Sequence, residues 1–496
     1  MRSRIVSTAS GKKAVQVVSK HDGKLTIHKH IGTFANNSEK DKLLKKAEEF
    51  IIQSTGQGSL LDILSSSSVK LSEIAITQSR PMLVYQLLSA VYDKLGFNSY
   101  PDPLIRDLVI ARIYSPASKR ETQEILSDLF GKSYTLKTVY RHLKNGIKKG
   151  LKESFQRALI SFVKNDLSDS LNLVFYDVTT LYFDSALKKG LRDFGFSKDH
   201  RPLDTQIVIG LVVNKDGVPL YFDVFQGNTF EVHTFLPVVK GILNLLGSTE
   251  LVVIADSAMI SQANVDKLIE AGIGFVVGAR IATLPLDLIN SISSELNAKN
   301  GKATTVTYRG QRLICEYSEK RAAKDKSDRL KQIAKAEGAI AAPSRITNRF
   351  RFVKTKGQTI SLNRDLVAKA EKLEGIKGYI TNTQLPEQTV IDRYHDLWRI
   401  ENSFRLTKSD LEARPIFHRL DETINAHLVI VFAGLAVCKY VELRTGMSIR
   451  KVLKIAEKVL THKVVNLNTG ETAYIETAVE DSALREKLNL LKSLGH

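Results

Sequence analysis

Residues 171–180 read Leu-Asn-Leu-Val-Phe-Tyr-Asp-Val-Thr-Thr. The first six have the length and composition of a buried strand, and Asp177 stands where that run ends. The run Val252–Ala255 repeats this design and is followed by Asp256. A carboxylate at the edge of a buried strand is costly unless it is paired or binds a cation, although each aspartate could instead cap the following turn. Two such acids on adjacent strands would repel each other, and a divalent metal ion would remove the repulsion.

Strand and helix patterns alternate around these two runs. Besides Leu171–Tyr176 and Leu251–Ala255, strands are expected at Thr205–Val213, Pro219–Phe225 and Gly274–Val277. Helices are expected between them at His233–Leu246 and Asn264–Ala271. Strands followed by alternating helix and strand are typical of a mixed α/β sheet.

The charge of the chain indicates its partner. Lysine and arginine total 72 and aspartate and glutamate 53, which gives a net charge of +19 and a pI of about 9.6. Such an excess attracts a polyanion, and nucleic acid is the usual one. The alternative is a protein that is merely basic, and charge alone does not say what is done to the polymer.

The cysteine content and the apolar runs indicate in which cellular compartment the protein is expected and whether it crosses a membrane. Only Cys315 and Cys438 are present, which argues against a disulfide framework or a cysteine zinc site and favours a reducing cytoplasm. The longest apolar run, Leu428–Val437, is shorter than the roughly 18 residues that cross a bilayer, so we expect a buried helix and no membrane partner. Bound to DNA, such a protein would be associated with the nucleoid.

A helix-turn-helix-like pattern precedes the first strand. Helical patterns at Arg120–Leu129 and from Thr135 onward flank a turn at Gly131–Tyr134. The second helix carries four basic residues at helical spacing: Lys137, Arg141, Lys144 and Lys148. This face suits contact with DNA phosphates, and its alternative is a solvated basic helix of a bundle.

A third acid lies in the segment from Tyr394 to Lys408. At about 100° per residue, a long continuous helix would place Tyr394, Glu401 and Lys408 within about 20° of one another, with Arg405 about 40° away. One edge would then present a hydroxyl, a carboxylate and two cations. The alternative is a surface helix in which Glu401 and Arg405 form an ordinary i,i+4 pair.

Together these blocks resemble the DDE transposases of bacterial insertion sequences, in particular insertion sequence family four and its close relatives. The signature of that group is Tyr, two residues, Arg, three residues, Glu, six residues, Lys. It maps onto Tyr394, Glu401 and Lys408, with Leu397 standing where the signature has arginine. The resemblance covers roughly Ser170–Leu443. Further matching stretches are Gly195–Pro202, Gly227–Thr229 with His233, Arg414–His418 and, more loosely, Ser115–Lys119.

The resemblance implies a fold and an activity. It implies a ribonuclease-H-like catalytic core interrupted by a β-rich insertion, with an N-terminal, mainly helical DNA-binding region. Two Mg²⁺ ions, for which Mn²⁺ can substitute, would be held by Asp177, Asp256 and Glu401. Backbone phosphates would be held by Tyr394, Arg405 and Lys408.

The resemblance also implies substrates and an assembly. A dimer would pair the terminal inverted repeats of a transposable element in a synaptic complex, cut them, and join them to target DNA without a small-molecule cofactor. Two alternatives are a metal-dependent nuclease or resolvase on the same core, which does not join strands, and a DNA-binding regulator without catalysis. A regulator would not need the three acids. A simple nuclease would not need the first 165 residues or the insertion.

Six segments are expected from these patterns. They are 1–100 (a hairpin, Lys13–Ser19 with Lys24–His30, and helices), 101–169 (helical, DNA-binding), 170–285 (first part of the core), 286–378 (β-rich insertion), 379–447 (second part of the core) and 448–496 (helical tail).

Overall fold

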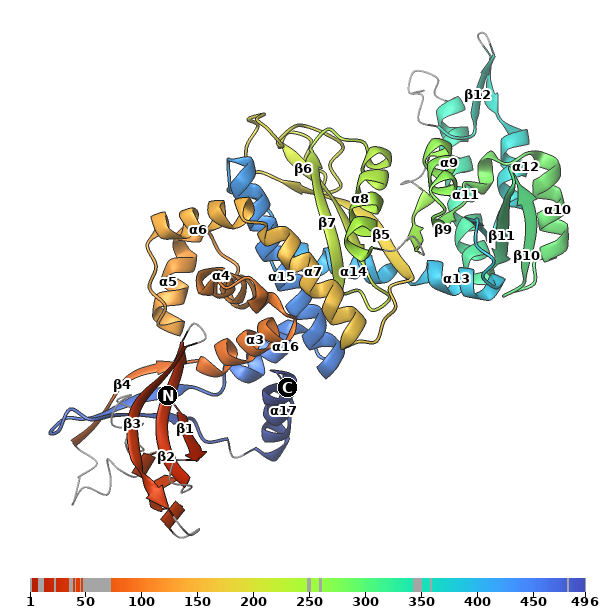
Figure 1. Ribbon diagram of the computed structural model, residues 1–496. Helices are drawn as coiled ribbons and strands as arrows, with labels where there is room; N and C mark the ends of the chain where they lie inside the picture. Colours follow the sequence, from red (N-terminus) through yellow and green to blue (C-terminus); the bar gives the residue numbers. More distant parts are fainter. Residues whose placement is uncertain are drawn as a thin grey trace. The chain divides into compact units, whose positions relative to one another are not determined.

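The structure is a computed structural model. It describes residues 2–7, 13–21, 24–34, 39–40, 42–44, 46–47, 73–247, 251–257, 261–341, 350–356, 359–479 and 481–495. The chain divides into two compact units (Figure 1). The first unit comprises residues 1–90, 124–133 and 449–496, and the second comprises 91–123 and 134–448. The six segments expected from the sequence stay a prediction.

The first unit holds two small antiparallel sheets. One consists of β1 (Arg2–Ser7), β2 (Lys13–His21) and β3 (Lys24–Phe34). The expected hairpin is therefore present, and its turn at residues 22–23 lies outside the described residues. The other sheet has the order β16 (Thr472–Glu476), β15 (Thr461–Asn466), β4 (Ile74–Arg80).

The C-terminal segment is not purely helical, as the sequence had led us to expect. It contains α16 (Ile449–Ala456), β15 (Thr461–Asn466), β16 (Thr472–Glu476), α17 (Ser482–Lys492) and η6 (Ser493–Gly495). Strand β15 pairs with β4 (Ile74–Arg80), almost 400 residues earlier in the chain. Pairing with a distant strand is a tertiary effect that local sequence does not reveal.

The second unit is built on one eight-stranded mixed sheet of order β10-β11-β14-β9-β8-β5-β6-β7. Its first three strands are β10 (Ala303–Tyr308), β11 (Gln311–Tyr317) and β14 (Ile376–Thr381). The central strands are β5 (Leu173–Tyr182), β6 (Gln206–Val213), β7 (Pro219–Gln226), β8 (Val252–Ala255) and β9 (Gly274–Gly278). Strand β6 is antiparallel to β5 and β7, whereas β5, β8 and β9 are parallel. All five expected core strands are present. The chain is thus a mixed α/β protein with a large mixed sheet.

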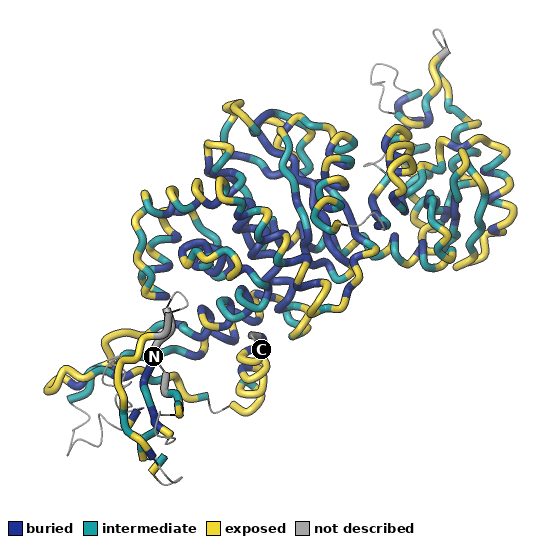
Figure 2. Tube along the Cα trace, in the orientation of Figure 1, coloured by how far each residue is buried: buried dark blue, intermediate teal, exposed yellow. Residues whose placement is uncertain are grey.

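Helices cover both faces of this sheet, which is why every residue of β6 is buried (Figure 2). On one face Phe235 of α8 (Glu231–Leu246) meets Tyr176 of β5, with ring centroids 5.1 Å apart. On the other face Phe432 of α15 (Asp421–Thr445) meets Phe222 of β7 at 4.9 Å. Helix α9 (Gln262–Glu270) connects β8 to β9.

Helix α15 is the central helix of the unit. It is long and apolar enough to span a membrane by length and composition, but 94% of its most apolar window is buried inside the protein. Helices α4, α6 and α7 pack against it. This burial makes it a core helix, as expected for the apolar run at 428–437.

The helices before the sheet have clear sequence determinants. They are α3 (Met82–Lys94), η2 (Phe97–Ser99), α4 (Pro103–Tyr114), α5 (Lys119–Phe130), α6 (Leu136–Lys148) and α7 (Leu151–Asn165). Asp102 caps α4 by accepting from the N–H groups of Leu104 and Ile105, and Thr135 caps α6 by accepting from that of Thr138. Gly150, at φ 75°, makes the turn into α7.

The segment expected to be a β-rich insertion contains more helix than strand. Its helices are α10 (Leu286–Leu296), α11 (Glu319–Ala341) and α12 (Arg364–Lys372), preceded by η4 (Ile281–Thr283). Its strands are β10 (Ala303–Tyr308), β11 (Gln311–Tyr317), β12 (Val353–Lys356), β13 (Thr359–Leu362) and β14 (Ile376–Thr381). Strand β14 pairs with β9, so three of these strands extend the main sheet. Helix α10 packs on this extension, where Ile289, Ile292 and Leu296 form a core with Leu313 and Cys315 of β11.

Candidate active site

The register of the sheet brings Asp177 and Asp256 together. In the parallel pair β5 and β8, Tyr176 lies opposite Ala255, and the next residue on each strand is the aspartate. Adjacent strands lie about 4.8 Å apart, so the two aspartates are cross-strand neighbours. The expectation that Asp256 follows the end of its strand is confirmed, whereas the expectation for Asp177 is wrong, because β5 continues for five residues past Asp177 and pairs there with β6.

Asp177 lies in an environment that disfavours its charge. Burial raises the pKa of its carboxyl to about 6, and the charge of Lys198 and the N–H of Val178 act in the opposite direction. The nearby carboxylates of Glu231 and Asp256 raise the pKa further. A buried acid surrounded by other acids is a site that a divalent cation would stabilise.

Tyr394 is held against Asp256. Its hydroxyl donates a 2.7 Å hydrogen bond to Oδ1 of Asp256, and its pKa is raised by burial and by that bond. The ring packs on Tyr379, with centroids 4.8 Å apart, and the ammonium of Lys377 lies 4.5 Å from its centroid. Gly278 makes room for it, because a Cβ there would lie 2.5 Å from the hydroxyl. Tyr394 is therefore placed to orient a carboxylate, whereas the sequence had suggested that it binds phosphate.

The helix carrying Tyr394 does not continue to Glu401. Helix α13 (Glu387–His395) ends, and α14 (Trp398–Ser409) begins after a turn at Asp396 and Leu397. Asp396 accepts hydrogen bonds from Arg393 and Arg399 on either side of this turn, at 3.4 and 3.2 Å. The expected continuous helix is therefore wrong, and the angles drawn from it do not apply across the break.

Helix α14 nevertheless covers the sheet face that carries Asp177. Side chains alternate along a strand, so Asp177, Thr179 and Leu181 share one face of β5. Thr179 and Leu181 line a small apolar space together with Phe404 and Thr407 of α14. Glu401 lies one turn before Phe404 and is exposed.

Glu401 belongs electrostatically to the same neighbourhood as Asp256. Burial and the charge of Arg321 lower the pKa of Lys377, while the carboxylates of Glu316, Asp256 and Glu401 raise it. However, no three acidic, histidine or cysteine side chains among the described residues lie close enough to hold one metal ion. The structure therefore pairs two of the predicted acids and leaves the third nearby.

Lys408 has a different partner from the one expected. Its ammonium lies 3.1 Å from Oδ1 of Asp199, and the guanidinium of Arg414 lies 3.5 Å from Oδ2 of the same residue. Lys408 thus does not share an edge with Tyr394. Arg405, by contrast, is exposed on α14, where it is free to meet a ligand.

Two charged residues at the site had been given no role in the sequence analysis. The ammonium of Lys198 donates to the carbonyl of Val178 at 2.7 Å and pairs with Glu231 at 2.7 Å, which places both beside Asp177. Lys198 lies in the stretch Gly195–Pro202, and Glu231 lies just after Gly227–Thr229. Those matching stretches were the available signal.

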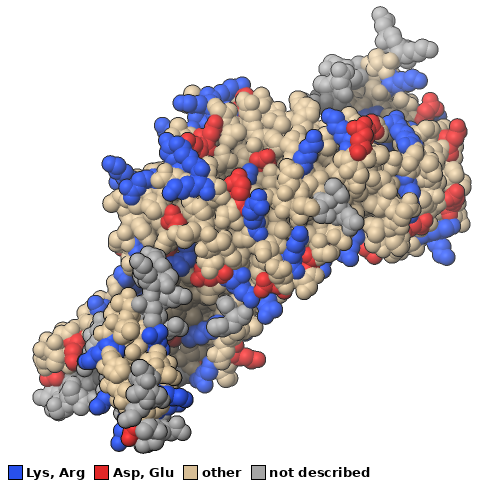
Figure 3. Space-filling model, viewed as in Figure 1, with Lys and Arg blue, Asp and Glu red and all other residues tan. Residues whose placement is uncertain are grey.

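The basic face expected on α6 is exposed. Figure 3 shows lysine and arginine side chains gathered over this part of the second unit. Lys144 and Lys148 pair with Glu422 at the start of α15, at 3.4 and 4.0 Å. Lys137 and Arg141 form no ion pair within the described part of the chain, so they are the freer cations of the face.

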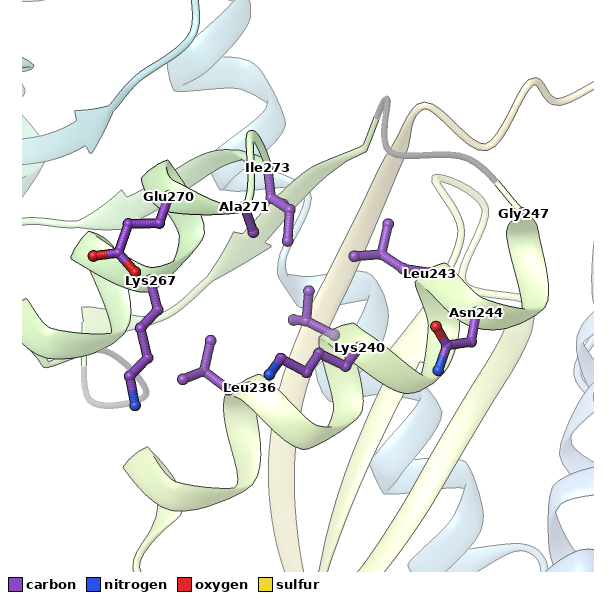
Figure 4. A pocket seen from close by; sticks show the side chains of 10 residues that line it. Leu236, Lys240, Leu243, Asn244, Gly247, Lys267, Glu270, Ala271 and Ile273 are labelled. Carbon is purple, nitrogen blue, oxygen red and sulfur yellow. The ribbon is translucent and has the colours of Figure 1, made fainter.

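A large groove in this unit lies away from the acids. It has a volume of about 1110 Å³ and lies between α8 and α9 (Figure 4). Its wall is mostly apolar and includes Leu236, Val239, Leu243 and Ile273. None of the predicted catalytic or DNA-binding residues lines it, so it has no part in the candidate site.

The donor set at the acids suits a hard divalent cation. Carboxylate oxygens are the ligands that Mg²⁺ prefers in proteins. Burial and the carboxylates of Glu231 and Asp256 raise the pKa of Asp177, which means that its negative charge is disfavoured. A bound divalent cation would stabilise that charge. Asp177 and Asp256 fit a metal ion, and Glu401 would complete the set from α14.

Comparison with known proteins identifies the family. The family model for the transposase DDE domain matches residues 172–436, more than half of the chain, and the chain belongs to this family. Its members are polynucleotidyl transferases that generally use divalent metal ions. Among solved structures, a piggyBac transposase synaptic complex with hairpin DNA, determined by cryo-electron microscopy, is similar with a TM-score of 0.38 and 8% identity. That match covers 74% of this chain and 70% of the other. No sequence match to a curated protein was found.

Proposed function

We propose that this protein is a DNA transposase that binds the ends of an insertion sequence, cleaves them and joins them to target DNA. The observation that supports this most is the cross-strand pair of Asp177 and Asp256, covered by the helix that carries Glu401, inside a transposase DDE domain. The strand order β7-β6-β5-β8-β9, with only β6 antiparallel to its neighbours, supports a ribonuclease-H-like core.

The residues of the candidate active site would have different roles. Asp177, Asp256 and Glu401 would hold two Mg²⁺ ions, and Tyr394 would fix the carboxylate of Asp256. When bound, these ions would activate the attacking oxygen and stabilise the leaving oxygen. Lys198 would hold Glu231 and balance the charge of Asp177 when no metal is bound.

Two phosphoryl transfers would follow each other at this centre. In the first, water attacks a phosphodiester at the element's end, the bond from phosphorus to the 3′ oxygen breaks, and a 3′-hydroxyl is released. In the second, that hydroxyl attacks a phosphodiester of target DNA and displaces the 3′ oxygen there. The number of phosphodiester bonds is conserved in the second step, so no energy cofactor is needed.

DNA would be held mainly by cations away from the acids. Lys137, Arg141, Lys144 and Lys148 on α6 offer phosphate contacts, and Arg405 offers one beside Glu401. Two copies of the chain would pair the two inverted repeats of the element, because both ends must be joined to the same target.

The experiment separates a transposase from a nuclease. The substrate is a labelled duplex carrying the inverted repeat that flanks the gene, mixed with supercoiled plasmid and Mg²⁺. A transposase gives nicked ends and also label joined covalently to the plasmid. Nicked ends with no joined product would favour the metal-dependent nuclease or resolvase, and absence of both would exclude the proposed activity.

A further inference from the structure

Two stretches that lie far apart in the sequence meet at a pocket in the second unit. The pocket has a volume of about 400 Å³, and residues 116–121 and 412–418 form much of its wall. The wall is completed by Arg112 of α4, Leu136 and Tyr140 of α6, and His427 of α15. It contains none of the predicted catalytic residues. We call it the Lys119 pocket.

Lys119 carries a buried charge without a counterion. Its side chain is 5% exposed, and no hydrogen bond or ion pair to its ammonium is found within the described part of the chain. Burial, followed by the charge of Arg112, lowers its pKa. Arg112 is itself 7% exposed and donates to the carbonyl of Ala117 at 2.9 Å. Glu412 acts on Arg112, whereas no carboxylate among the described residues acts on Lys119, so two buried cations share a single exposed acid and the pocket has room for an anion.

The histidines of the wall do not supply that anion. His418 and His427 lie with ring centroids 5.3 Å apart, and burial, followed by the charges of Lys119 and Arg112, lowers the pKa of His418 to about 3. Nε2 of His427 donates to the carbonyl of Ala413 at 3.2 Å, and its buried Nδ1 has no hydrogen-bond partner among the described residues. That atom has hydrogen-bonding capacity which a bound group or water would fill.

The carboxylates of the wall do not neutralise Lys119 either. Glu121 and Glu412 are both exposed, and only Glu412 acts on a buried cation, namely Arg112. The pocket also receives the first turn of the 12-residue helix α5, whose positive end favours an anion.

We propose that the Lys119 pocket binds a phosphate group. Lys119 and Arg112 supply the charge, and the start of α5 supplies the N–H donors that remain beside that of Glu121, which donates to Oγ of Ser118. Arg414 at the wall pairs with Asp199, which also holds Lys408, so charged contacts lead from the pocket to α14. Inorganic phosphate and a backbone phosphate of DNA share this chemistry, and the DNA assignment rests on the proposed function.

The first arm of the test uses inorganic phosphate and thermal unfolding of the full-length protein. Chloride is replaced by phosphate at constant ionic strength. The midpoint temperature of the wild type should rise with phosphate concentration, because a ligand that binds only the folded state stabilises it. Lys119→Met should unfold at a higher temperature than the wild type without phosphate and should lose the response. If Lys119→Met does not fold, Lys119→Gln is measured in its place, and its midpoint temperature should not rise with phosphate concentration.

The second arm uses duplex DNA and measures affinity across a range of salt concentrations. If the pocket takes one backbone phosphate, Lys119→Met should bind about 10- to 100-fold more weakly, since hydrogen bonds to charged groups contribute that much. The log-log salt slope should fall by about 0.9. Lys439→Met is the matched control, because Lys439 is equally buried but paired with Glu442 at 3.1 Å. Lys439→Met should be less stable than the wild type. It should keep both the rise of the midpoint temperature with phosphate and the wild-type affinity and salt slope of DNA binding.

The outcomes separate the alternatives. A lost phosphate response with an unchanged DNA slope supports the pocket and assigns it to free phosphate. An unchanged phosphate response in the Lys119 variants, or a lower midpoint temperature of Lys119→Met without phosphate, overturns the proposal. A wild type that binds DNA but never cuts it would count against the proposed function and leave both arms readable.

Discussion

The hydroxyl of Tyr394 donates a 2.7 Å hydrogen bond to the carboxylate of Asp256. This bond links the end of helix α13 to the end of strand β8, across 138 residues of sequence. It gives the tyrosine of the signature a physical task, which is to fix the direction of one acid of the predicted metal site. Residues that orient metal ligands are often as important for metal affinity as the ligands themselves.

Tyr394→Phe should raise the Mg²⁺ concentration needed for half-maximal DNA nicking by about 10-fold or more, because Asp256 loses the group that orients it. DNA binding should be unchanged. Tyr379→Phe is the control, since that ring packs on Tyr394 but its hydroxyl donates to Glu316. Equal Mg²⁺ requirements for both variants and the wild type would mean that the hydrogen bond has no role in metal binding.

Asp177→Asn should abolish cleavage and stabilise the metal-free fold. Burial raises the pKa of Asp177 from its ordinary value of 3.8 to about 6 in the folded protein. The cost of burying the charged carboxylate is therefore fully present above pH 6. It is absent below pH 3.8, where the carboxyl is protonated in both the folded and the unfolded state. The gain in unfolding free energy at pH 8 in EDTA should be at most about 3 kcal/mol and should vanish near pH 4. Asp256→Asn should also lose cleavage but without that gain, because Asp256 is exposed and accepts hydrogen bonds from Tyr394 and from the N–H of Ser257. Destabilisation by Asp177→Asn would contradict this account of the site.

Lys137→Ala combined with Arg141→Ala should lower the log-log salt slope of DNA binding by about 1.8 in the full-length protein, since each lost phosphate contact removes about 0.9. The full chain is required because α6 packs on α15, which lies far from it in the sequence. Lys324→Ala with Lys326→Ala, two exposed lysines of α11, is the control. An identical slope in both double variants would place DNA recognition elsewhere.

Asp199→Asn should destabilise the protein by roughly 2–3 kcal/mol, because it leaves Lys408 and Arg414 without their shared partner in a largely buried position. Asp204→Asn, in the same loop, removes a more exposed pair with Arg201 and should cost about 1 kcal/mol or less. Chemical denaturation of both variants measures the difference. Similar small losses would show that Lys408 does not depend on Asp199.

The strands and the two aspartates could be predicted because their signals are local. A buried strand is an apolar run of fixed length, and an acid at its end is conspicuous, so β5, β8, Asp177 and Asp256 followed from composition and pattern. The pairing of β5 with β8 followed from the order of elements. None of this required knowledge of distant contacts.

The rest depended on contacts between distant residues. The segment around Asp396 and Leu397 has no proline or glycine and keeps a helical pattern, so nothing local in the sequence indicates the break between α13 and α14. Lys408 forms an ion pair with Asp199 because the loop at residues 195–202 lies against α14. Glu231 and Lys198 lie beside Asp177 because of tertiary packing, and their spacing in the sequence does not predict this contact.

Asp177, Asp256 and Glu401 are proposed to form one metal-dependent site, in which Glu401 is the acid that comes from helix α14. The direct measurement is single-turnover nicking of a labelled inverted-repeat duplex by Glu401→Gln, in Mg²⁺ and in Mn²⁺. Helix α14 ends at Ser409, so Glu412 lies beyond it beside the Lys119 pocket, and Glu412→Gln is the matched control. Glu401→Gln should lose cleavage by several orders of magnitude with DNA binding intact, while Glu412→Gln keeps most of it. Cleavage at wild-type rate by Glu401→Gln would contradict the assignment of the third acid and of the site itself.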